Sequence, residues 1–198
     1  AIPTPESEGW RGEPEPTNDG YGQAKRFGER LTILAGASKK IKPLVVRPSN
    51  MYSPREQFND PNIHVIPRLC QRLLSGENPL VIRGSKETQR SYLHARDAAI
   101  GLVLLAAQDY CGIVNLPAAH EDELTIEELV RSLCRISGFR PTIEWDTSKA
   151  SGYPRRLSSL TLFHQIVGFP WKPPTRIQVG LVETLDGLRN SALTCAHE

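Results

Sequence analysis

The sequence has little of several features that would point to particular classes of protein. Its four cysteines, at positions 70, 111, 134 and 195, form no C-x-x-C pair and no cluster with histidine at zinc spacing. We therefore expect no metal site and incidental thiols in a reducing compartment, the cytoplasm. The longest apolar run, 98–107, is too short to cross a bilayer. A net charge of +2, with both signs mixed, argues against nucleic acid or membrane as a partner.

A second absence concerns cofactor binding. No glycine-rich strand–turn–helix that could hold a dinucleotide pyrophosphate occurs in the sequence. Strands alternate with helices, which favours an α/β fold, yet only 43–47 and 113–116 are apolar enough for the centre of a parallel sheet. We therefore expect the second half of a larger fold, with an amino-terminal nucleotide-binding half absent.

The periodicity of apolar residues predicts the local structure. A first helix should begin at Asn18 or Asp19 and stop at Gly36, and Thr125 with Glu128 forms a capping box for a later one. In full, we expect loops at 1–18 and 48–62, helices at 19–35, 66–75, 95–108, 125–137, 159–167 and 175–190, and strands at 43–47, 80–83, 91–94, 113–116 and 142–145.

Tyr21 and Lys25 are the most informative pair. Four residues apart on a helix, their side chains share one face. A nearby cation lowers the pKa of a phenol, and a shift of three units needs about 4 kcal/mol of differential stabilisation. The pair would then serve as a general base near neutral pH. On spacing alone, an exposed helical pair without function is the better explanation.

Further motifs follow this pair in order. Glu29 and the run RPSNMYSP at 47–54 come first, and then Gln89-Arg90, His94, Asp97, Asn115, Pro-Arg-Arg at 154–156 and Gly-Phe-Pro-Trp at 168–171. Taken together, the motifs resemble the extended short-chain dehydrogenases, the NAD(P)-dependent epimerases and dehydratases of nucleotide sugars. The segment 55–67 is most similar to the GDP-fucose synthase type. The family usually has glycine where Ser53 stands.

The resemblance implies a fold and partners. Residues 1–50 would form the terminal part of a doubly wound, Rossmann-type NAD(P)-binding domain. Residues 51–198 would form a small α/β nucleotide-sugar-binding domain, with 92–116 packing back on the Rossmann sheet. The cofactor would be NAD or NADP, with the fucose-synthase likeness favouring NADP, and a homodimer is expected. Because the family's glycine-rich loop and catalytic Ser or Thr lie upstream of the Tyr, a complete site would need an amino-terminal half.

The resemblance also implies roles at the cofactor end. Tyr21 would exchange a proton with a sugar hydroxyl while hydride moves to or from the nicotinamide, and Lys25 would hold the nicotinamide ribose. Pro48 and Asn50, at the carboxyl end of the strand 43–47, would lie beside the cofactor. The Asn50 amide would also bind a sugar hydroxyl or a phosphate oxygen, unless it only stabilises its own turn.

At the substrate end, His64 would be a general acid in epimerisation, unless it bonds a backbone carbonyl at a helix start. Four arginines, Arg68, Arg90, Arg155 and Arg156, are candidates for binding the substrate, since guanidinium matches phosphate oxygens; solvated surface arginine is the alternative. Asp97 is interpreted as a helix cap.

Three functions agree with these residues. The first is an NAD(P)-dependent epimerase/reductase of a nucleotide-diphosphate sugar, with Tyr21 as the acid/base. The second is a truncated, non-catalytic homologue that binds a nucleotide sugar or a partner chain. The third is a nucleotide-sugar 4,6-dehydratase.

Overall fold

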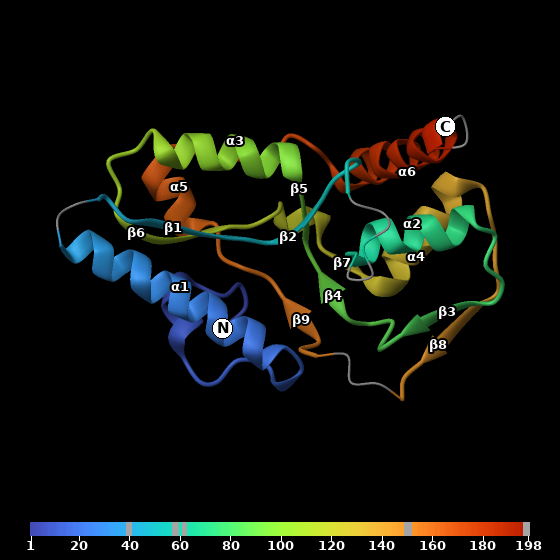
Figure 1. Ribbon diagram of the computed structural model, residues 1–198, viewed down its shortest axis with the longest axis horizontal. Helices are drawn as coiled ribbons and strands as arrows, with labels where there is room; N and C mark the ends of the chain where they lie inside the picture. The colour runs from blue at the N-terminus through green and yellow to red at the C-terminus, as the bar shows by residue number, and fades with distance from the viewer. Residues whose placement is uncertain (39–40, 57–59, 61–62, 149–151, 196–198) are drawn as a thin grey trace.

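The computed structural model describes residues 1–38, 41–56, 60, 63–148 and 152–195, and its elements gather in two groups that lie side by side along the long axis (Figure 1). Parallel strand pairs and helices build both groups, so the expected α/β architecture is confirmed. Each group has its own cluster of buried apolar side chains.

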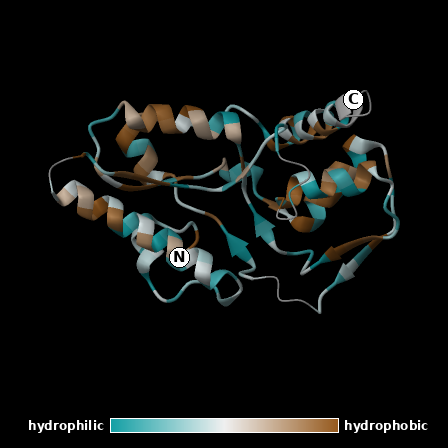
Figure 2. Cartoon of the chain, viewed as in Figure 1, coloured by the Kyte–Doolittle hydropathy of each residue, from teal (hydrophilic) through white to brown (hydrophobic). Residues whose placement is uncertain are grey.

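The first group is a parallel pair of strands between helices. β1 (Leu44–Pro48) pairs with β6 (Gly112–Leu116), so the two strands predicted as the sheet centre are neighbours. α1 (Asp19–Ala37) and α3 (Ala95–Ala106) lie on opposite sides of the pair, and α5 (Thr161–Val167) packs against β6 (Figure 1). β1, β6 and much of α3 are apolar (Figure 2), as expected for elements that share a core.

The second group is built on three helices. α2 (Val65–Leu74), α4 (Ile126–Ser137) and α6 (Ile177–Cys195) pack against one another and bury leucines from all three. A second parallel pair, β3 (Leu80–Arg83) with β8 (Ile143–Asp146), lies beside them.

Short elements connect the groups. β2 (Asn50–Tyr52) pairs with β5 (Tyr92–His94), and β4 (Gln89–Arg90) lies between β7 (Leu124–Thr125) and β9 (Arg155–Arg156). The described residues also form three 3₁₀ turns: η1 (Glu6–Trp10), η2 (Pro16–Asn18) and η3 (His120–Asp122). These elements bring segments distant in sequence to one place.

The first helix begins where it was predicted to begin, but it ends later. Gly36 does not stop α1, which runs on to Ala37; a Cβ at Gly36 would lie 2.2 Å from Pro43, so this glycine permits a close approach instead. Asn18 is the cap residue, but its side chain makes no capping hydrogen bond; its amide nitrogen lies 3.4 Å from a Glu15 oxygen. The predicted loop 48–62 also contains the short strand β2.

Two later predictions had opposite outcomes. The capping box of Thr125 and Glu128 is present in both directions. Interpreting Asp97 as a helix cap was wrong: His94 is the cap residue of α3, and its ring accepts from the backbone N–H of Arg96. Asp97 is fully buried and accepts two bonds from Thr175, at 2.8 Å from the backbone nitrogen and 2.9 Å from the hydroxyl. It therefore fixes the approach to α6.

Within the described residues, no helix is both long and apolar enough to span a membrane. The division at residue 50 stays a prediction, although the β1–β6 pairing does place part of 92–116 beside the first segment.

Candidate functional site

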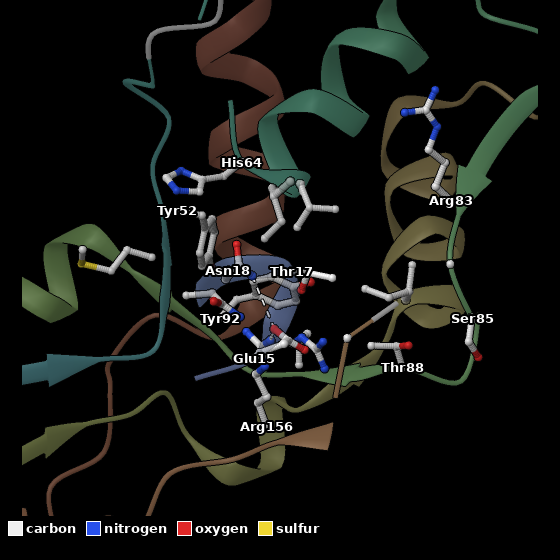
Figure 3. A pocket seen from close by; sticks show the side chains of 18 residues that line it. Glu15, Thr17, Asn18, Tyr52, His64, Arg83, Ser85, Thr88, Tyr92 and Arg156 are labelled. Atoms are coloured by element: carbon white, nitrogen blue, oxygen red, sulfur yellow. Dashed lines mark hydrogen bonds and ion pairs between the residues drawn. The ribbon is translucent and has the colours of Figure 1, made fainter. Parts of the chain in front are cut away.

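A cavity of about 440 Å³ lies where the two groups meet. Its wall combines η2, the strands β2 and β4, the starts of α2 and α4, and the segments around 83–88 and 152–156. Figure 3 shows Thr17, Asn18, Tyr52, His64 and Arg156 converging on this space from separate elements. Because β4 pairs with β9 and β2 with β5, backbone pairing fixes the relative positions of these side chains.

Two arginines face one another across the strands at the base of this cavity. Arg90 on β4 and Arg156 on β9 are partners in the strand register, and both line the cavity. Arg90 is half-buried, and burial first and the neighbouring Arg156 second lower the pKa of its guanidinium. Two neighbouring guanidinium groups, of which that of Arg90 is partly desolvated, form a site that favours binding of an anion.

Asn50 and His64 lie on the rim. Asn50 comes from β2, and His64 from the residue that starts α2. The His64 ring makes no capping hydrogen bond, and its Nδ1 lies 3.6 Å from a carboxylate oxygen of Glu56. A largely exposed imidazole beside a carboxylate has access to ligand and can carry a proton.

Two tyrosines form part of the wall and stay neutral. Burial raises the pKa of Tyr92 to about 12, and burial also raises the pKa of Tyr52, helped by the charge of Asp97. Neither hydroxyl has a hydrogen-bond partner among the described residues. These phenols therefore contribute buried rings to the cavity wall and no acid/base chemistry at neutral pH.

Tyr21 and Lys25 lie outside the cavity wall, on α1. The Lys25 Nζ is 5.4 Å from the centre of the Tyr21 ring, so the two side chains do share one helix face. Tyr21 is 68% exposed, and no residue of α1 is buried. The pair therefore presents an open, cation-supported phenol to solvent.

The structure brings together four of the predicted site residues: Asn50, His64, Arg90 and Arg156. The others lie elsewhere. Pro48 is the exposed last residue of β1, and Arg68 lines a neighbouring groove with Arg72 and Val81. Arg155 points to Glu123, with 2.6 Å between their closest atoms. Arg155 and Arg156, equivalent in the sequence, thus face different surroundings.

Glu15 was not recognised from the sequence. It precedes η2, lines the cavity and forms an ion pair with Arg156, while the backbone N–H of Tyr153 donates to it at 2.7 Å. The segment 1–18 was predicted as a loop, and an acid between two prolines carries no signal for such a contact. Among the described residues, no cluster of three His, Cys, Asp or Glu could hold a metal.

Comparison with known proteins identifies relatives of this chain. Among curated proteins, the chain is 31% identical over 186 residues to a probable GDP-L-fucose synthase of Oryza sativa subsp. japonica, covering 92% of this chain and 56% of that protein. It is 31% identical over 176 residues to the GDP-L-fucose synthase of Sinorhizobium fredii, covering 87% and 55%. The chain thus spans a little over half the length of these relatives.

Solved structures share the fold. A GDP-L-fucose synthetase from Naegleria fowleri, bound to NADP, superposes with a TM-score of 0.82 at 25% identity, covering 98% of this chain and 60% of that one. A UDP-glucose 4-epimerase from Thermotoga maritima, with UDP-glucose, gives 0.82 at 23% identity, covering 97% and 59%. The sequence profile described as "NAD dependent epimerase/dehydratase family" matches residues 2–116. The chain belongs to the NAD-dependent epimerase/dehydratase family.

Proposed function

We propose that this chain binds a nucleoside-diphosphate sugar in the cavity and serves an NAD(P)-dependent epimerase/reductase reaction. The observation that carries the proposal is the facing pair Arg90 and Arg156 at the base of a cavity with His64 and Asn50 on its rim. A guanidinium pair matches the oxygens of a diphosphate. The likeness to GDP-L-fucose synthases supports guanosine as the nucleoside.

Each side chain then has a role on the substrate. Arg90 and Arg156 bind the diphosphate, and the buried Tyr92 ring forms part of the wall beside it. Asn50 bonds a sugar hydroxyl. His64 gives a proton to the sugar carbon from which one was removed, as a general acid must during epimerisation.

Tyr21 and Lys25 supply only part of a site for the dinucleotide cofactor. Tyr21 and Lys25 fit the nicotinamide riboside, because an exposed phenol with an ammonium over its ring is open to both a ribose and a sugar. The dinucleotide, when bound, supplies or accepts the hydride. Tyr21 exchanges the hydroxyl proton, and Lys25 stabilises the phenolate. The sequence contains no glycine-rich loop for the pyrophosphate, so the chain alone does not build a complete dinucleotide site.

Titration calorimetry with GDP tests the binding proposal on the chain itself. Arg90→Ala and Arg156→Ala should each weaken GDP at least about tenfold, since each removes a charge-assisted bond. Arg155→Ala is the matched control. It removes the same kind of side chain from the other residue of β9, which forms an ion pair with Glu123. Equal GDP affinities for wild type and Arg90→Ala would refute the proposal that the diphosphate binds at this site.

The reaction is tested in a polypeptide that joins this chain to a nucleotide-binding half. Tyr21→Phe should abolish turnover with little loss of stability, because the side chain is exposed. His64→Asn should stop epimerisation while reduction of a keto-sugar persists. If a joined protein binds the sugar nucleotide but Tyr21→Phe turns over like wild type, the acid/base role is refuted.

A binding-only protein is the second candidate, because the cavity and its arginine pair can hold a ligand without Tyr21, which lies outside the cavity wall. It predicts nucleotide-sugar binding without turnover in any joined polypeptide. A 4,6-dehydratase is the third, and it predicts loss of water from the sugar, which mass spectrometry of the product would detect.

A homodimer is proposed through α1, whose exposed side chains Phe27, Leu31 and Leu34 recur on helical spacing. Sedimentation velocity should show a dimer that Leu31→Lys dissociates; an unchanged species would reject this face. The cytoplasmic location stays a prediction.

A further inference from the structure

Glu15 is the one acidic side chain among the described residues that line the cavity. It reaches the base of the cavity from the segment before η2, and its carboxylate is about 10% exposed. Arg156 donates to one oxygen, and the backbone N–H of Tyr153 donates to the other at 2.7 Å. Figure 3 shows Glu15 and Arg156 side by side beneath Thr17 and Asn18.

The backbone is shaped to admit this carboxylate. Gly152 has a φ of +68°, and a Cβ there would lie 2.3 Å from a Glu15 oxygen. Burial raises the pKa of Glu15, but the hydrogen bonds from Arg156 and Tyr153 outweigh burial and hold that pKa below its ordinary value. The group is therefore charged at neutral pH, in contact with one of the two arginines assigned to the phosphates.

The ion pair of Glu15 with Arg156 determines the net charge around a bound ligand. Arg156 is compensated by Glu15, while Arg90 donates to the carbonyl of Gln89 and pairs with no carboxylate among the described residues. A diphosphate inside a nucleotide sugar is esterified at both ends and carries one negative charge per phosphate. A free nucleoside diphosphate ends in a monoester phosphate, which carries about −1.5 to −2 at pH 7. The additional charge would lie in a site that already holds a carboxylate.

Building on the proposed function, we propose that Glu15 is a specificity-determining residue that favours the diphosphate ester of a sugar over the free nucleoside diphosphate. Glu15 repels the additional charge of the free terminal phosphate, while the arginine pair attracts both ligands. The carboxylate therefore weakens competition from free nucleotide more than it weakens binding of the sugar nucleotide.

The test compares two ligands on each variant, so that a change in the position of Arg156, which affects both ligands, cancels in the ratio. Titration calorimetry at pH 8 and low salt gives Kd for GDP and for GDP-fucose. Glu15→Gln should shift the ratio of the two Kd values towards GDP by about five- to tenfold, the scale of one charge in a partly screened site. Glu13→Gln is the matched control: it makes the same change two residues away, where the carboxylate bonds Gln23 outside the cavity.

A ratio in Glu15→Gln within about twofold of wild type would overturn the inference, including the case in which both ligands weaken equally. If Glu15→Gln does not fold, the variant that also carries Arg156→Gln removes the ion pair as a unit. Relative to Arg156→Gln alone, this double variant should again shift the ratio of the two Kd values towards GDP. An unchanged ratio with Arg90→Ala still weakening GDP refutes the role of Glu15 and keeps the proposed function. A wild type that binds neither ligand refutes both.

Discussion

The ion pair between Glu29 and Arg47 should contribute strongly to stability, because it is mostly buried and bidentate. Glu29 on α1 accepts from two guanidinium nitrogens of Arg47 on β1, each at 2.7 Å, and from the Trp10 indole at 3.1 Å. The side chains are 14% and 20% exposed. Arg47 also donates to the carbonyl of Glu6 at 2.9 Å, so one group joins η1, α1 and β1.

Glu29→Gln keeps the size of the side chain and removes its charge. The amide nitrogen of glutamine would face guanidinium N–H groups, and Arg47 would remain as a mostly buried cation without a carboxylate. Removing one partner of a fully buried pair costs about 3 to 5 kcal/mol; reducing this for the residual exposure gives about 2 to 4 kcal/mol here. Gly9 permits the close approach of Arg47, since a Cβ there would lie 2.2 Å from the guanidinium.

Urea denaturation followed by circular dichroism measures the loss as a change in midpoint at constant slope. The matched control is Glu127→Gln, which breaks an exposed pair with Arg131 one turn along α4, worth about 0.3 to 0.5 kcal/mol. Equal losses in both variants would refute the reasoning that burial decides the energy. A larger loss in Glu29→Gln would also show that the position of the helix carrying Tyr21 depends on this contact.

Three further predictions concern other parts of the molecule. NADPH should bind this chain more weakly than about 1 μM by calorimetry, since the sequence has no loop for its pyrophosphate, and sub-micromolar affinity would contradict this. Leu133→Ala, in the core of the helical group, should cost about 2 to 5 kcal/mol in urea denaturation, against little for Leu74→Ala at an exposed position; similar losses would disprove the core assignment. Burial lowers the pKa of His94, although Glu183 opposes the shift from 3.4 Å. Below about pH 6.5 the unfolded chain protonates first, so stability should fall as the pH drops from 6.5 to the folded-state pKa, and a flat profile of thermal midpoints would count against this.

Local chemistry determined which elements could be predicted. The helix after Thr125 was predicted because its capping box and apolar spacing act within a few residues. The two-residue strands carrying Arg90 and Arg156 have no such signal, since their pairing joins segments far apart in the sequence. The sequence named Arg90 and Arg156 among four candidate arginines, but only the tertiary structure shows that these two are neighbours on paired strands.

The errors have a physical cause of the same kind. Asp97 follows a helix start, so local rules favour a cap, but the ring of His94 takes that position and leaves Asp97 to bind Thr175. Glu15 lies between prolines in a segment without periodicity, so sequence gives no reason to place it against Arg156. In each case the contact that positions the side chain joins segments far apart in the sequence, which local rules do not describe.

The two ends of the proposed reaction therefore differ in what this chain provides. The substrate end is built from paired strands and buried side chains of the chain itself, so binding and its selectivity can be measured directly. At the cofactor end, Tyr21 and Lys25 lie on a helix without any buried residue, and the ion pair of Glu29 with Arg47 joins this helix to β1. Because a general base acts only on a substrate within about 3 Å, and Tyr21 lies outside the cavity wall, turnover requires a further surface that brings sugar and nicotinamide to the phenol. We therefore expect the isolated chain to bind the sugar nucleotide without turning it over.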